Sequence, residues 1–366
     1  MIAKTEEYRY APNYAVPPGE TLRETIEAKG MSQAELAKRT GRTPKTINEI
    51  IQAKAPITAE TAMQLEHVLD VPARFWMGLE SRYQTALAAQ VEREQLAAMD
   101  DWVRRFPVRA LARLHIIRDV SDKAAQAREL LDFFRVASPT AWEAVWARPI
   151  VAYRQSPAFT SDPYSIAAWL CMGERAAERI ECASFDRVKF REALQRTREL
   201  TFRPPEIFQP ELVEIFAAAG VAVVFTPELP KTHVSGATKW LTSEKALIQL
   251  SLRHKTDDHL WFCFFHEAAH IWLHGKKDIF LHGYEEIDGS DKEEEANKFA
   301  AEQLIPSIAY QAILEARDLS GSAILRHSTD LGIPPGVLLG RLQHDGHIAY
   351  SKLNYLKKRY SWTDTA

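Results

Sequence analysis

Cysteine is scarce in this sequence of 366 residues: only Cys171, Cys182 and Cys263 are present, and no two of them form a CxxC pair. That number and spacing exclude a disulfide framework and favour a reducing compartment with free thiols. Long apolar runs are also missing. No stretch approaches the ~18 residues that a membrane-spanning helix needs, and the N-terminus lacks the apolar core of a signal peptide. We therefore expect a cytoplasmic protein that does not enter a membrane.

A strong charge of one sign is absent as well. The net charge of -3 excludes no class of partner, because nucleic-acid binding depends on local patches rather than on the sum over the chain. Hydrophobic residues at 46% and charged residues at 26% are ordinary for a globular protein. The length indicates two or three domains with sizeable cores.

The patterning predicts a multi-domain, mainly α-helical protein. We expect a flexible leader at 1–18, a domain of short helices at 19–83, a helical middle region at 84–203 and a mixed α+β domain at 204–366. In the last of these, VAVVF and KALIQLSL are strand candidates for a small sheet. Trp142 and Trp146, four residues apart, are predicted to be core residues rather than a ligand-binding box.

Residues 32–52 have the layout of a helix-turn-helix. Ser32 caps the segment QAELAKRT, and Glu35 three residues later completes a capping box. Gly41 lies in the turn, and Pro44 suits the first turn of a second helix. The shared core is predicted to contain these apolar residues: Ala34, Leu36, Ala37, Ile47, Ile50 and Ile51.

Local charge favours DNA as the partner of this segment. Residues 38–54 contain five basic side chains against Glu49 alone, a surplus of four. The residues predicted to read bases or hold phosphates are Gln33, Arg42, Thr43, Lys45, Thr46, Asn48 and Glu49. A helical bundle used only for protein contact is the alternative.

A metal site is predicted in the segment His266-Glu267-Ala268-Ala269-His270. Two histidines four apart on a helix share one face and reach one zinc ion. Glu267 lies beside them, where its carboxylate could take a proton from a water molecule at the metal. On the motif alone, hydrogen-bonded core histidines are an equally good interpretation.

The third ligand is expected from the segment KEEEANKFAAEQLIP. A helical wheel places Glu293 on the apolar face of this helix, Glu295 at its edge and Glu294 away from it. Glu293 is therefore the first candidate and Glu295 the second. His274 follows His270 by four and is predicted to support a ligand rather than to be one, because a catalytic zinc keeps a position open for water.

These segments resemble two known families. HEAAHIWLHG, followed by the later helix with Ala-Asn-Lys-Phe-Ala and a Leu-Ile-Pro stop, strongly resembles the ImmA/IrrE zinc metallopeptidases from about Pro204 to the C-terminus. The resemblance implies one Zn²⁺ per chain on His266, His270 and Glu293, Glu267 as general base, and a zincin-like α+β domain with a small sheet.

The stretch from about Pro18 to Tyr83 resembles the HigA-like branch of the XRE family, through PITAETAMQLE and the FWMGL segment. This resemblance implies a five-helix helix-turn-helix domain, operator binding in the major groove and a homodimer. Relatives commonly have Asn-Gly-Lys where this chain has Gln52-Ala53-Lys54.

Two functions follow from this combination. The first is a DNA-binding regulator whose zinc-dependent endopeptidase domain cleaves a narrow protein target, such as a repressor or the chain itself. The second is a non-enzymatic repressor or antitoxin whose zinc domain senses a ligand or docks a partner. Glu267 favours hydrolysis, because a purely structural zinc site has no need of a base.

Overall fold

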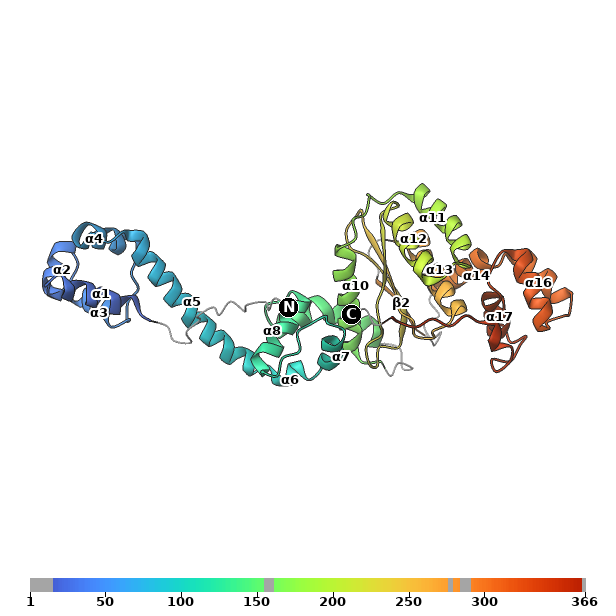
Figure 1. Cartoon of the computed structure of the whole chain (residues 1–366), viewed down its shortest axis with the longest axis horizontal. Coiled ribbons are helices and arrows are strands. Elements are labelled where there is room, and N and C mark those ends of the chain that lie inside the picture. Colours follow the sequence, from blue (N-terminus) through green and yellow to red (C-terminus); the bar gives the residue numbers. More distant parts are fainter. Residues whose placement is uncertain (1–15, 155–160, 276–278, 284–290, 364–366) are drawn as a thin grey trace, which may run out of the picture. The chain divides into compact units, whose positions relative to one another are not determined.

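The computed structural model describes residues 16–154, 161–275, 279–283 and 291–363 (Figure 1). Most of the leader expected at 1–18 lies outside these residues, and the first helix already begins at Pro18. The chain divides into two compact units. The first comprises residues up to 100 together with 122–127, and the second comprises 101–121 and 128–366.

The first unit contains the five helices that the XRE resemblance implies. They are α1 (Pro18–Ala28), α2 (Gln33–Thr40), α3 (Pro44–Ile51), α4 (Ala59–Leu69) and α5 (Ala73–Ala97). Their buried apolar residues form one core: Leu22, Ile26, Leu36, Ala37, Ile47, Ile50, Ile57, Ala62, Leu65, Leu69 and Trp76. Ile51 packs against this core as expected, but Ala34 is exposed, so its predicted place in the core is wrong.

The capping of α2 and α3 largely follows the sequence pattern. The Ser32 hydroxyl accepts a hydrogen bond from the backbone N–H of Glu35 at 3.2 Å. The reciprocal half of the predicted capping box is absent, because the Glu35 carboxylate accepts from Arg39 Nε at 2.7 Å instead. Gly41 ends α2 with φ of 69°, and Pro44 opens α3 as predicted. The helix-turn-helix geometry is therefore set by local residues.

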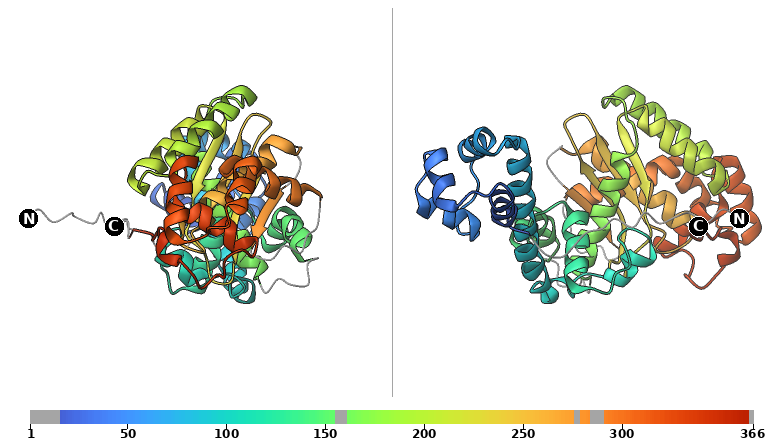
Figure 2. Two further views of the ribbon diagram at one scale, coloured as in Figure 1. Left: turned by 90° about the vertical axis from the view of Figure 1, so that its right-hand side faces the viewer. Right: turned by 60° about the vertical axis from the view of Figure 1, so that its left-hand side comes forward.

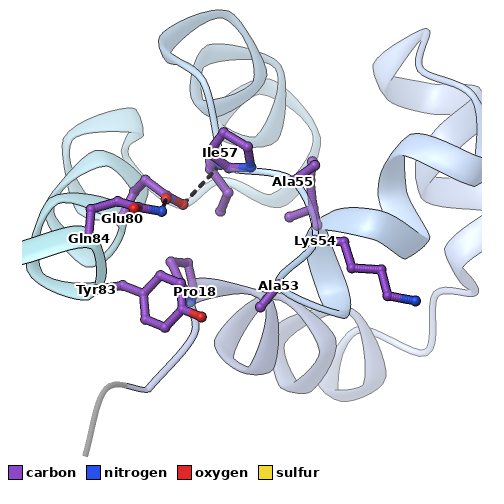
Figure 3. Close-up of a pocket in the computed structure, with 11 residues that line it drawn as sticks. Pro18, Ala53, Lys54, Ala55, Ile57, Glu80, Tyr83 and Gln84 are labelled. Carbon is purple, nitrogen blue, oxygen red and sulfur yellow. Dashed lines mark hydrogen bonds between the residues drawn. The ribbon is translucent and has the colours of Figure 1, made fainter. Parts of the chain in front are cut away.

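Ala53, which stands where relatives have glycine, adopts φ of 55° in the turn after α3. It lines a cavity of about 100 Å³ together with Glu80 (Figure 3). The Glu80 carboxylate accepts from Ile57 N at 2.9 Å, a bond that joins the segment after the turn to α5, and from Gln84 Nε2 at 2.8 Å within α5. The left-handed conformation costs a non-glycine residue roughly 1–2 kcal/mol.

We therefore expect Ala53→Gly to raise the free energy of unfolding of the first unit by about 1 kcal/mol. Denaturant unfolding followed by circular dichroism measures it. Gly41→Ala is the mirror control: φ is 69° there and an added Cβ meets nothing within 4 Å. It should destabilise by a similar amount. A less stable Ala53→Gly variant would show that relief of backbone strain at this turn does not dominate the change in the free energy of unfolding.

The remaining helices before the sheet are α6 (Asp100–Val103), α7 (Val108–Arg113), α8 (Lys123–Phe134), α9 (Pro139–Arg154), α10 (Pro163–Glu178), α11 (Arg187–Leu200) and α12 (Pro205–Ala217). Trp142 and Trp146 of α9 are 3% and 6% exposed and pack edge-on against Phe134, which confirms them as core residues. Packing thus divides the helical middle region expected at 84–203, since α10 lies against the sheet and α11 packs on α12.

The sheet of the second unit has four strands in the order β1-β3-β2-β4. They are β1 (Val221–Phe225), β2 (Val234–Trp240), β3 (Ala246–Leu250) and β4 (Ile279–Gly283). β1 and β3 are parallel, whereas β2 runs antiparallel to both β3 and β4. The two strand candidates in the sequence are β1 and β3, and the small sheet is confirmed; β2 and β4 were not expected.

Helices cover both faces of this sheet. Val221 and Val223 of β1 face the larger hydrophobic core of this unit, to which α12 and α13 (Asp257–Leu273) also contribute. Ala222 and Val224 face the other side of the sheet, where they pack near Ala177 of α10. Figures 1 and 2 show α10 on one side of the strands and α12 and α13 on the other. The chain ends with α14 (Asp291–Leu304), α15 (Ser307–Glu315), α16 (Gly321–Leu331), α17 (Pro335–His344) and the 3₁₀ turn η1 (Asn354–Leu356). No helix among the described residues is both long and apolar enough to cross a bilayer.

Candidate metal centre

Helix α13 carries the HExxH residues into the centre of the second unit. It is apolar on most of its surface, and its aromatic residues Trp261, Phe264 and Phe265 are fully buried. His266, Glu267 and His270 are 0%, 0% and 1% exposed. Three ionisable side chains in so dry a setting are costly unless they are bonded to one another or to an ion. The local sequence therefore forms a buried polar cluster inside a hydrophobic helix.

Helix α14 adds a carboxylate to the two histidines. Glu293 Oε2 lies 3.1 Å from His266 Nε2, and Glu293 Oε1 lies 3.4 Å from His270 Nε2. The two Nε2 atoms are 3.0 Å apart. Glu294 points away and pairs with Lys298 at the surface. Of the acidic residues weighed in the sequence, the structure brings Glu293 to the histidines.

The donor set fits a zinc ion. Ligands about 2.1 Å from a tetrahedral zinc lie roughly 3.4 Å from one another, close to the three separations found here. Two imidazoles and a carboxylate leave a fourth position for water or substrate, as in catalytic rather than structural zinc sites. His266, His270 and Glu293 are the residues that would hold the ion.

Hydrogen bonds orient the first histidine for this role. His266 Nδ1 lies 2.9 Å from the side-chain oxygen of Asn297, one turn after Glu293 on α14. Because the amide oxygen accepts, Nδ1 carries the proton and Nε2 presents its lone pair to the cluster. Asn297 thus positions a ligand without being one.

A relay of two residues orients the second histidine. His270 Nδ1 lies 2.9 Å from Nδ1 of His274, and His274 Nε2 lies 3.2 Å from Glu295 Oε2. Protons on His270 Nδ1 and His274 Nε2 satisfy both bonds and leave His270 Nε2 without a proton. Both Nε2 lone pairs then face each other, an arrangement that a cation between them would stabilise. The Glu295 carboxylate therefore contacts His274 rather than the cluster of His266, His270 and Glu293. His274 in turn supports His270.

We expect His274→Ala to weaken zinc binding by about 10–100-fold, the usual cost of losing a group that supports a metal-bound histidine. Competition with a chromophoric chelator measures the affinity. His344→Ala, which removes an exposed histidine of α17, is the control and should leave the affinity unchanged. An unchanged affinity in His274→Ala would show that the relay does not orient His270.

Glu267 is held between α13 and strand β2. Its Oε2 accepts a hydrogen bond from the Thr238 hydroxyl at 2.7 Å, and Oε1 has no hydrogen-bond partner among the described residues. Gly236 makes room for this carboxylate, since a Cβ there would lie 2.6 Å from both Glu267 Oε1 and Cys263 Sγ. One carboxylate oxygen is anchored and the other remains available to accept a proton.

Burial sets the proton affinity of this group. It raises the pKa of the Glu267 carboxyl well above its ordinary value; the Thr238 hydroxyl opposes the rise and the charge of Glu293 adds to it. Burial likewise raises the pKa of the Cys263 thiol, which stays protonated beside it. A carboxylate with raised proton affinity is a stronger base, and a cation nearby would oppose the shift.

Three supporting residues were not singled out from the sequence: Thr238, Gly236 and Asn297. Asn297 had a readable signal, because it follows Glu293 by four on the same helix face. Gly236 and Thr238 lie on β2, a strand that the apolar pattern did not reveal. Their role depends on the pairing of β2 with β3.

The predicted DNA-contacting residues gather on α2, α3 and the turn between them. Lys45 is 83% exposed and Asn48 is exposed on α3. Thr43 is the N-cap of α3, with its hydroxyl 2.9 Å from that of Thr46. Gln33, at the first position of α2, is half-buried, and Glu49 lies 3.8 Å from Lys45.

The basic surplus of this segment is partly neutralised by residues outside it. Arg42 pairs with Glu60 at 2.9 Å and donates to Gln64 at 2.7 Å, which ties it to α4. Arg39 pairs with Glu35. Lys45 also lies 3.8 Å from Glu49, so Lys38 and Lys54 are the basic side chains of this segment that have no ion pair among the described residues. Arg42 has a structural role in addition to any contact with DNA.

Comparison with known proteins agrees with both halves of the chain. Residues 22–76 match the helix-turn-helix family, and residues 217–342 match the IrrE N-terminal-like domain. The chain is 36% identical over 77 residues to virulence-associated protein I of Dichelobacter nodosus, over 21% of this chain and 71% of that protein. It is an XRE-type helix-turn-helix protein that also carries an ImmA/IrrE-type domain.

Solved structures of HigA-type antitoxins resemble the N-terminal part. The Pseudomonas aeruginosa antitoxin HigA with higBA promoter is 34% identical, over 22% of this chain and 90% of that one, with a TM-score of 0.22. An addiction module antidote protein of the HigA family from Coxiella burnetii is 26% identical, over 22% and 90%, with a TM-score of 0.21. The two family matches together describe a regulator with a peptidase-like domain.

Proposed function

We propose that this protein is a DNA-binding regulator whose ImmA/IrrE-type domain is a zinc-dependent endopeptidase. The observation that carries the proposal is the convergence of His266, His270 and Glu293 beside a buried Glu267 with one unpartnered carboxylate oxygen. A structural zinc site would need the three ligands and a fourth, but not this carboxylate.

The residues divide the work of peptide hydrolysis. A zinc ion held by His266, His270 and Glu293 would polarise the scissile carbonyl and acidify a water molecule. Glu267 Oε1 would take a proton from the attacking water and deliver it to the leaving amide nitrogen, while Thr238 holds Oε2 and fixes the carboxylate. Asn297 and His274 keep the imidazoles in the ligating tautomer.

The first unit supplies the regulatory half of the proposal. An operator would be read by the exposed side chains of α3, principally Lys45 and Asn48, with Thr43, Thr46 and Glu49 beside them and Gln33 and Arg42 at the flanks. The protein acts as a homodimer. Its peptidase domain cleaves a narrow range of protein targets: a repressor or a segment of the chain itself.

The decisive experiment separates zinc binding from hydrolysis. Glu267→Gln should keep about one zinc per chain and lower the rate of peptide cleavage by roughly 10²–10⁴-fold, the usual contribution of a general base. Cells that express the wild type, Glu267→Gln or the surface control Glu294→Gln are compared by mass spectrometry of new protein N-termini. Cleavage sites shared by wild type and Glu294→Gln and missing in Glu267→Gln would support the enzyme.

The competing function is a non-enzymatic regulator whose zinc domain senses a ligand or docks a partner. Under that alternative, no cleavage site depends on Glu267, and a reporter controlled by the operator responds equally in wild type and Glu267→Gln. A wild-type protein without zinc, prepared without chelators, would contradict the proposed peptidase and leave the helix-turn-helix function standing.

A further inference from the structure

A second basic region lies outside the helix-turn-helix. Residues 104–118 contain five arginines, one histidine and no acidic residue, in a chain whose net charge is -3. They include the whole of α7 (Val108–Arg113) and belong to the second unit. Neither the helix-turn-helix match at 22–76 nor the IrrE-like match at 217–342 includes them.

Two of these arginines have no side-chain partner in the part of the chain that the structure describes. Arg118 is engaged by Glu129, with Nε 2.7 Å from Oε1, and Arg105 donates to the Tyr164 hydroxyl at 2.9 Å. In the part of the chain that the structure describes, Arg109 and Arg113 form no ion pair. Both are exposed, and Nε of Arg113 donates to the backbone carbonyl of Arg109 at 3.3 Å.

These two arginines line a groove of about 1020 Å³, together with His115, Ile116 and Asp119. Arg118 and Glu129 also line it and neutralise each other, so two guanidinium groups stand against the single carboxylate of Asp119. Arg109 and Arg113 are four residues apart on one helix and therefore share a face. Their spacing lets them engage neighbouring anionic groups of an extended polymer.

We propose that this groove, which we call the α7 groove, binds the phosphodiester backbone of DNA without regard to base sequence. Guanidinium groups bind phosphate with two parallel hydrogen bonds, and such contacts add affinity but no sequence information. DNA is favoured over an acidic protein because the first unit already has a fold that binds DNA. The inference rests on the proposed DNA binding and adds a second contact region in the other unit.

The salt dependence of DNA affinity tests the α7 groove in the full-length protein. Each phosphate contact contributes about 0.9 to the slope of log affinity against log salt. The variant Arg109→Ala/Arg113→Ala should therefore have a slope smaller in magnitude by about 1.8. The ratio of wild-type to variant affinity should then fall roughly twelvefold between 50 and 200 mM salt. Fluorescence anisotropy measures the affinity for a DNA duplex selected by the wild-type protein and for a scrambled duplex. The slope should change by the same amount with both duplexes.

Two control variants make the test specific. Arg191→Ala/Arg196→Ala removes two exposed arginines of α11 and should leave the slope unchanged. Arg109→Lys/Arg113→Lys keeps the charge and should keep most of the slope. Unaltered circular dichroism spectra and melting temperatures establish that the alanine variant is folded, as the exposure of both side chains predicts.

The outcomes separate this inference from the proposed function. Wild-type binding to DNA with an unchanged slope in Arg109→Ala/Arg113→Ala would overturn the α7 groove and leave the helix-turn-helix function intact. Polyglutamate serves as a model of an acidic protein. If Arg109→Ala/Arg113→Ala lost affinity for polyglutamate but kept its affinity for DNA, DNA would be overturned as the ligand and the groove would be assigned to an acidic protein. A wild-type protein that binds no duplex would overturn both proposals together.

Discussion

Replacing Glu293 by alanine is expected to abolish the zinc binding that we propose for the metal centre. Glu293 is the one carboxylate with oxygens 3.1 and 3.4 Å from the two histidine nitrogens, among the residues that the structure describes. Its loss leaves only two imidazoles, too few for a stable site. We expect the affinity to fall by more than the roughly 10–100-fold that loss of a supporting group causes. Elemental analysis of zinc per chain measures the effect.

Glu294→Ala and Glu295→Ala are the controls for this substitution. Glu294→Ala also removes a negative charge from the first turn of α14, so it matches the effect of Glu293→Ala on the helix dipole. Glu294→Ala should retain zinc fully. Glu295→Ala should weaken binding only modestly, through His274. Zinc retained in Glu293→Ala and lost in Glu295→Ala would show that the second glutamate, and not the first, is the ligand.

The second large effect is expected far from the metal centre, at Lys357. Its ammonium group lies 2.6 Å from Asp258 Oδ2, and the two side chains are 9% and 8% exposed. This pair ties the C-terminal segment to the beginning of α13, which also carries the metal residues. Removing one partner of a buried pair costs about 3–5 kcal/mol, because the other charge is left uncompensated. We expect Lys357→Ala to lower the free energy of unfolding of the second unit by about this amount.

Lys358→Ala is the matched control, one residue along the chain. Its ammonium group makes a 3.3 Å hydrogen bond to the carbonyl of Phe202 at the surface, so its removal should change stability by less than about 0.5 kcal/mol. Denaturant unfolding of metal-free and zinc-loaded protein gives both values. Equal stability of the two variants would show that the Asp258–Lys357 pair contributes no net stability.

Much of the metal site could be predicted because its residues are close together in the sequence. The four-residue spacing of His266 and His270 is a property of any α-helix, and the apolar positions of α14 identify which glutamate faces inward. The strands β1 and β3 were predictable for a related reason: β1 is a continuous apolar run and β3 is apolar except for Gln249, as expected of strands covered on both faces.

Other features depended on contacts between distant residues. β2 contains Ser235, Gly236 and Lys239, a composition that resembles a loop; its pairing with β3 and β4 makes it a strand. The capping box failed at Glu35 because a nearby arginine competed for the carboxylate. Arg42 looked free in the sequence, and a glutamate 18 residues later along the chain neutralises it.

The sequence by itself determined the two family halves and the five N-terminal helices through resemblance to known families. It determined the HExxH helix and the choice of Glu293 through local spacing and helix periodicity. Only the tertiary structure decided what surrounds them. Pairing of strands brought Thr238 and Gly236 to Glu267, and packing of α14 on α13 brought Asn297 to His266. Folding of the middle region placed Arg109 and Arg113 in one groove without an ion pair to any described residue. These are contacts between residues far apart in the chain, and no periodicity of a single segment specifies them.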